Sequence, residues 1–115
     1  MELERTIKIT REMAPHAPEN QIGIYKLKRW TWYEKQIALR RATIILDSEK
    51  GISETPLQDF NLHMLNVCLI EAPFGRGDLK EDIKNIKQLD VDVGDRLQDV
   101  CQELNEITRG EKAGF

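Results

Sequence analysis

The residue types that carry out catalysis or bind metals are few and scattered in this sequence. The two histidines, His16 and His63, fall in a proline-rich stretch and on the expected polar side of a helix, where a surface role is the simplest interpretation. The two cysteines, Cys68 and Cys101, lie among apolar residues without a CxxC pair, so we expect them to be small core residues. The spacings that bind phosphate, hold zinc or expose a nucleophile (GxxxxGK(S/T), GxGxxG, HExxH and GxSxG) are absent. The sequence therefore predicts no catalytic residues, no metal site, no cofactor and no enzyme activity.

Recognition of a partner is indicated by the densest aromatic cluster of the chain. Trp30, Trp32 and Tyr33 lie close together in sequence and are flanked by basic side chains. Three interpretations stay open: the rings anchor the start of a helix in the core, form a protein-binding hot spot, or stack on the bases of single-stranded nucleic acid. We predict these three residues as candidates for a partner-binding surface.

Charge is divided between two segments of the chain. Residues 26–41 carry six basic side chains and one acidic one, and residues 90–106 carry six acidic side chains and one basic one. Two solvated faces are the simplest interpretation, and contact between the segments of neighbouring copies, or with a partner, is the functional one. The residues predicted for such contacts are Arg40 and Arg41 in the basic segment and Asp95, Asp99, Glu103 and Glu106 in the acidic segment. We therefore expect a homo-oligomer.

Composition limits the classes to which the protein can belong. The chain has 115 residues, of which 40% are hydrophobic and 32% charged, so we expect a single domain over residues 1–109 with a flexible tail at 110–115. The net charge of -3 argues against a general nucleic-acid-binding domain. No apolar run approaches the ~20 residues needed to span a bilayer, and the first residues lack the apolar segment of a signal peptide. We therefore expect no membrane association and a cytoplasmic location.

The elements that must position these residues begin with two strands. Apolar and polar residues alternate over 3–11 and again over 22–29, on either side of a turn-rich stretch that contains Pro15 and Pro18. A two-stranded ribbon is marginally stable alone in water, so it must pack against helices or against another subunit.

The rest of the chain predicts helices with well-marked starts. Thr31 and Glu34 form a capping box, which predicts a helix over 32–47 whose apolar residues do not fall in one stripe. Pro56 suits the first position of a second helix, which we expect to end before Pro73.

Two more helices complete the predicted fold. Asp78 caps the third, expected over 79–89, and Asp92 caps the fourth, expected over 93–108. The predicted fold class is mainly α, with about four helices and a small N-terminal two-stranded β ribbon.

Three segments also follow the motif order of a known family. Residues 30–35, Trp-Thr-Trp-Tyr-Glu-Lys, resemble a (Leu/Arg)-Thr-Trp-x-Glu-(Lys/Arg) segment that opens a first helix, with Trp30 in place of the leucine or arginine. Residues 65–73 match a helix that ends in a Leu-x-x-(Glu/Ala)-Pro stop, and residues 91–105 match a closing helix with a Leu-Asn end. With these motifs, which cover about residues 22–108, the chain resembles the tail assembly chaperones of long-tailed bacteriophages and prophages.

The resemblance implies a nonenzymatic assembly factor. Such chaperones bind the long, helix-rich tape-measure protein, keep it soluble before tail-tube subunits polymerise around it, and are absent from the finished tail. Our first hypothesis is therefore a tail assembly chaperone that binds and solubilises a tape-measure protein. The alternatives are a structural component of a phage tail, baseplate or tail-like particle, and a small nucleic-acid-binding regulator that uses residues 26–41.

Overall fold

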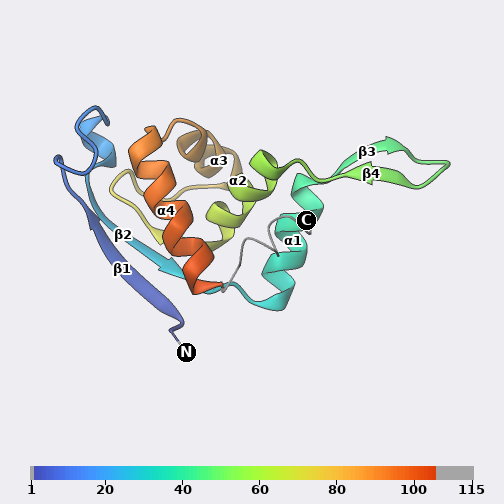
Figure 1. Ribbon diagram of the computed structural model, residues 1–115, viewed down its shortest axis with the longest axis horizontal. Coiled ribbons are helices and arrows are strands. Elements are labelled where there is room, and N and C mark those ends of the chain that lie inside the picture. Colours follow the sequence, from blue (N-terminus) through green and yellow to red (C-terminus); the bar gives the residue numbers. More distant parts are fainter. Residues whose placement is uncertain (1, 106–115) are drawn as a thin grey trace.

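The structure is a computed structural model in which residues 2–105 are described, and over that range it has an α+β fold (Figure 1). The elements in chain order are β1 (Glu4–Ile9), the 3₁₀ turn η1 (Glu19–Gln21), β2 (Gly23–Lys28), α1 (Trp32–Ala42), β3 (Ile44–Asp47), β4 (Ile52–Glu54), α2 (Leu57–Cys68), β5 (Leu69–Glu71), α3 (Leu79–Lys87) and α4 (Val91–Leu104). Within the described residues the strands form two separate sheets.

The predicted fold class, mainly α with a two-stranded ribbon, is wrong. The first helix ends at Ala42 instead of continuing to residue 47, because the β-branched run that starts at Thr43 favours extended backbone. Thr43 also stabilises this end, since its hydroxyl donates to the Leu39 carbonyl at 2.7 Å. A further strand, β5, forms directly after α2, where the sequence had predicted four more helical residues.

A three-stranded antiparallel sheet, in the order β1-β2-β5, holds the N-terminal part of the chain. The predicted pairing of the two N-terminal strands is confirmed, with Ile7 opposite Tyr25. One face of this sheet packs against α4, and Ile9, Tyr25 and Leu27 are fully buried there. The Tyr25 hydroxyl donates to the Gln21 carbonyl at 2.7 Å, and burial raises the pKa of Tyr25 to about 12.

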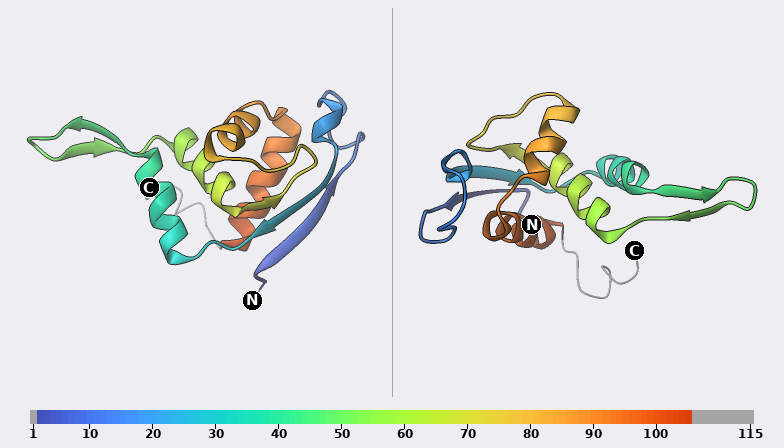
Figure 2. Two further views of the ribbon diagram at one scale, coloured as in Figure 1. Left: turned by 180° about the vertical axis from the view of Figure 1, so that it is seen from behind. Right: turned by 90° about the horizontal axis from the view of Figure 1, so that it is seen from above.

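The helices pack around α2, which contacts α1, α3 and α4 (Figure 2). Met64 on α2 and Leu97 and Val100 on α4 are fully buried in the resulting core. None of the helices within residues 2–105 has both the length and the apolar character needed to cross a bilayer.

The starts of α1, α3 and α4 follow the capping rules, whereas α2 begins at Leu57 without a side-chain cap, so Pro56 precedes the helix and is not its first residue as predicted. The capping box of α1 is confirmed, because the Glu34 amide donates to Thr31 Oγ1 at 3.1 Å and the Thr31 amide donates to Glu34 Oε1 at 2.9 Å. The cap of α4 is Asp90 and not Asp92, so this helix begins two residues earlier than predicted. The predicted end of that helix at 106–108 and the predicted tail at 110–115 lie outside the described residues.

The second sheet is a hairpin of β3 and β4, which we call the arm (residues 44–54). It projects away from the helices along the longest axis of the molecule (Figure 1). The principal extents of the molecule are 49 × 31 × 23 Å. At its tip Asp47 Oδ1 accepts from the Glu49 and Lys50 amides, and Gly51 supplies a left-handed φ of 69°. The arm therefore has a well-formed turn but, unlike the first sheet, none of the helices of residues 2–105 packs against it.

Candidate functional site

A groove of about 350 Å³ lies between α2, α3 and α4. Its apolar wall is made by side chains of all three helices and of the turn between α3 and α4: Leu62, Leu65, Ile86, Leu89 and Val91. Leu65 and Ile86 form the buried floor, while Val91 is exposed at the mouth. An apolar depression of this kind suits the apolar side chains of a partner.

The rim of the groove is acidic. Asp59, Asp90 and Asp95 line it, against the single ammonium group of Lys87. Asp95 is one of the residues predicted for partner contact, and in the structure it lies beside the apolar wall of the groove. A partner with basic side chains beside its apolar ones would find opposite charge on both sides of the groove.

One buried glutamine fixes the shape of this site. Gln21, in the turn η1, donates from Nε2 to the Gln88 carbonyl at 3.0 Å and accepts at Oε1 from the Asp90 amide at 2.9 Å. Both bonds hold the turn between α3 and α4, and Asp90 in turn caps α4 through the Asp92 amide at 3.1 Å. The N-terminal segment therefore sets the rim of a groove made by the C-terminal helices.

A glycine keeps the groove open. Gly94 lines it on α4, and a Cβ added there would meet the Leu89 Cβ at 3.8 Å, an ordinary van der Waals distance. The helix therefore tolerates a side chain at this position, and a large one would fill the groove.

The three predicted aromatic residues lie in two environments. Trp30 is only 9% exposed and packs edge-on against Phe60, with ring centroids 5.9 Å apart, so it belongs to the core. Trp32 and Tyr33, on the first turn of α1, are 75% and 68% exposed. These two rings, unlike Trp30, are available to a partner.

The predicted charged residues are not gathered at one place. Arg40 and Arg41 are exposed on the last turn of α1, about 12 Å along the helix from Trp32. Of the acidic residues, Asp95 lines the groove and Asp99 is exposed on α4, whereas Glu103 pairs with Arg5 of β1. Glu106 lies outside the described residues.

The cysteines form a buried polar cluster with Asn105. The Asn105 side-chain amide donates to the Cys101 carbonyl at 2.8 Å and to the Cys68 sulfur at 3.4 Å, while its Oδ1 accepts from the Trp30 amide at 2.9 Å. Interaction with Cys68 and burial raise the pKa of the Cys101 thiol. Both cysteines are free and buried, and the bonds of Asn105 link α2 and α4 to Trp30, between β2 and α1.

A second buried polar cluster holds the loop before α3. Arg76 donates from Nη2 to the Asn66 carbonyl at 3.0 Å and pairs with Asp82 at 3.1 Å, and Asp82 accepts from the Gly77 amide at 2.8 Å. Burial lowers the pKa of Arg76, and the carboxylate of Asp82 opposes that shift. The cluster fixes the loop against α2, and within the described residues Arg76 Nη1 is buried without a hydrogen-bond partner. None of its residues lines the groove.

His63 is less exposed than the sequence had indicated. It is half-buried on α2, and its Nδ1 atom is buried without a hydrogen-bond partner among the described residues. Burial, with a smaller contribution from the charge of Arg41, lowers the pKa of His63. His16 is exposed.

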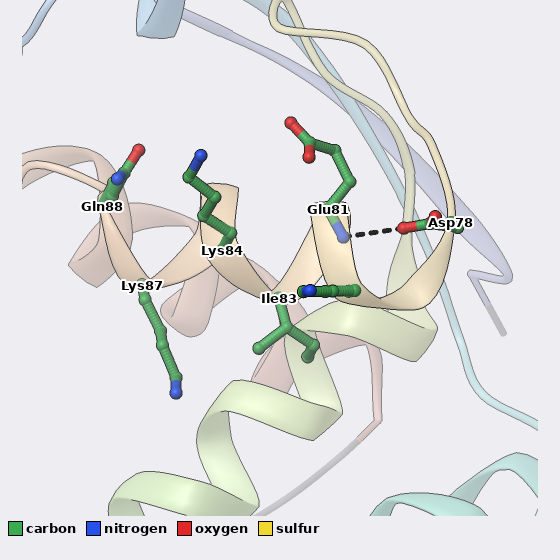
Figure 3. Close-up of a pocket in the computed structure, with 7 residues that line it drawn as sticks. Asp78, Glu81, Ile83, Lys84, Lys87 and Gln88 are labelled. Atoms are coloured by element: carbon green, nitrogen blue, oxygen red, sulfur yellow. Dashed lines mark hydrogen bonds between the residues drawn. The ribbon is translucent and has the colours of Figure 1, made fainter.

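A second, wider hollow of about 660 Å³ runs along α3, and Figure 3 shows the residues that line it. Asp78, Glu81, Lys84 and Lys87 all come from this one helix and its cap, and Asp78 accepts from the Glu81 amide at 2.8 Å. Lys87 extends away from Lys84 and Glu81 in this view. The hollow gathers no groups from different elements, so it is a weaker candidate than the groove.

The part of the chain that the structure describes holds no cluster of three or more potential metal-binding side chains. Sequence reasoning identified Asp95 but missed the groove and Gln21. The periodic apolar residues of α2 and α3 were the available signal, but which of them meet depends on how three helices pack. Comparison with protein-family models, with curated proteins and with solved structures finds no match for this chain.

Proposed function

We propose that this protein is a tail assembly chaperone that binds a tape-measure protein and keeps it soluble during tail assembly. The observation that carries the proposal is the apolar groove between α2, α3 and α4 with its acidic rim. The motif order over residues 30–35, 65–73 and 91–105, which resembles that family, supports the same function.

The groove fits one face of an amphipathic helix. An α-helix presents apolar side chains at intervals of three and four residues, and two or three of them would contact Leu62, Leu65 and Leu89. Each apolar side chain buried in this way contributes about 1.5–3 kcal/mol before the cost of ordering the client. Lysine or arginine residues that flank the apolar face of the client would meet Asp59 and Asp95.

The proposed role places the chain in the cytoplasm of the cell in which tails assemble. A chaperone is released when the tube forms, whereas a structural component stays. Mass spectrometry of purified particles is therefore expected to find no copy of this chain, and its presence at stoichiometric levels would favour a structural tail component.

Co-expression tests the binding itself. The probe is the protein encoded by the longest open reading frame just downstream of the gene, pulled down through an affinity tag on this chain. We expect that long protein to be recovered in the soluble fraction only when this chain is present. Equal solubility without it, and no capture, would refute the proposal.

A groove-filling substitution connects this result to the site. Gly94→Phe adds a ring where the groove is open, and we expect at least about a tenfold loss of captured client. Arg96→Phe is the matched control, because Arg96 is an exposed residue of the same helix that does not line the groove. If both variants capture client equally, the client binds elsewhere.

A further inference from the structure

The arm exposes a run of apolar side chains. Ile45 is 70% exposed and Leu46 58% exposed, and Ile44 and Ile52 are also exposed. Most apolar side chains of this size are buried in a folded domain, and neighbouring ones that stay exposed mark an interaction surface.

The arm also lacks the support that such a hairpin needs. A two-stranded hairpin is marginally stable by itself in water, and no third strand within residues 2–105 pairs with β3 or β4. The arm extends away from the helices in both Figure 1 and Figure 2, so its apolar side chains do not lie in the apolar groove of the same molecule. Within residues 2–105 nothing covers its apolar side chains, so a second copy of the chain is a candidate to do so.

The ends of the arm carry opposite charge. At its base, the last turn of α1 presents Arg40 and Arg41, both exposed and without an ion pair to any residue of 2–105. Glu54, opposite Ile44 in the hairpin, is also exposed at this end, so the two arginines outnumber one carboxylate there. Near its tip, Asp47 and Glu49 outnumber Lys50. A second arm that lies alongside in the opposite direction would bring each tip to the arginines of the other copy.

We infer that two copies of this chain associate through their arms, which lie side by side and antiparallel about a two-fold axis with β3 next to β3. The same apolar residues, Ile44, Ile45 and Leu46, then cover one another, as a two-fold interface requires. A bulge between Ile45 and Asp47 interrupts the strand, so side-chain packing provides the contact rather than a long hydrogen-bonded ladder. The tip-to-base charges fix the antiparallel direction.

This arrangement leaves the groove open. No residue of the arm lines the groove, so each copy in the pair keeps its own site for a client. The inference stands whether or not the proposed function is correct, because self-association is measured without any client.

Light scattering across a range of concentrations tests the pairing. The purified chain is expected to approach twice its mass of 13.4 kDa as concentration rises. Ile45→Asp combined with Leu46→Asp would place four carboxylates in the symmetric contact, and we expect pairing to weaken by at least about a hundredfold. Ile24→Asp is the matched control, because Ile24 is an exposed isoleucine of the other sheet.

A charge exchange tests the direction of the arms without disturbing their apolar residues. Arg40→Glu with Arg41→Glu makes the base acidic, and Glu49→Lys makes the tip basic, so each variant alone should pair more weakly at low salt. An equimolar mixture of the two variants should recover pairing, since every tip then meets a base of opposite sign.

Three outcomes would overturn the inference. A chain that stays monomeric at all concentrations does not pair. A double aspartate variant that pairs as well as the Ile24→Asp control places the interface elsewhere. A variant mixture that pairs no better than either variant alone excludes the antiparallel, tip-to-base arrangement.

Discussion

The two sheets of this protein differ in what surrounds them. The sheet of β1, β2 and β5 has one face packed on α4, with Tyr25 and Leu27 fully buried, and its outer edge strand β1 carries charged residues. The arm has no helix of the described part of the chain against it and exposes Ile45 and Leu46. Charged residues on an edge strand discourage pairing with other chains, and apolar ones favour it. Within residues 2–105 the first sheet is thus covered by its own chain, whereas the apolar side chains of the arm are not.

The sharpest way to test this comparison is the same kind of truncation in both sheets. Leu27→Ala removes a fully buried side chain beside α4 and is expected to lower the free energy of unfolding by about 2–5 kcal/mol. Ile45→Ala removes an exposed one and is expected to change it by less than about 0.5 kcal/mol. Urea unfolding at a concentration where the chain is monomeric gives both values. Similar losses would mean that the arm is buried within its own molecule.

A substitution with a smaller expected effect tests how the segment after β2 is joined to α4. Asn105→Ala removes the bonds to the Trp30 amide and the Cys101 carbonyl and leaves both groups buried, which we expect to cost about 1–3 kcal/mol. The same truncation at the half-exposed Asn61 serves as the control and is expected to have little effect. Equal free energies of unfolding for the two variants would show that Asn105 does not connect sheet and helix.

The smallest expected effect is the pH dependence of stability that comes from His63 on α2. The folded state holds the pKa of His63 below its usual value, so the unfolded chain binds a proton more readily. The stabilisation by neutral His63 is therefore complete above pH 6.5 and is lost as pH falls through the lowered pKa of the folded state. His63→Gln should flatten this part of the profile of unfolding free energy against pH. An unchanged slope would mean that other titrating groups cause this pH dependence of the unfolding free energy.

The sequence predicted the elements that depend on local rules. The alternation in β1 and β2 and the Thr31–Glu34 capping box act between neighbouring residues, and both are confirmed. The arm was missed because the short apolar run Ile44-Ile45-Leu46 has no period that separates a helix from a strand. Strand β5 was missed because no turn residue separates it from α2.

The candidate site was predictable only in part. Asp95 was found from its place on the charged face of α4, but the apolar wall of the groove combines residues of three helices whose packing the sequence does not specify. Gln21 was missed for a similar reason, since its partners Gln88 and Asp90 lie far away in sequence. Trp30 was predicted as a candidate for partner contact, and only the fold shows that Phe60 covers it.

The bonds from Gln21 to the turn before α4 also determine when the groove forms during synthesis and folding of the chain. A ribosome releases the N-terminal strands first, yet one face of their sheet packs against α4, the last helix within residues 2–105, and the bonds from Gln21 to the groove rim need the turn before α4. Contacts between residues so distant in sequence form late in folding. A chain still being translated therefore has no finished groove, and only copies that have left the ribosome present it.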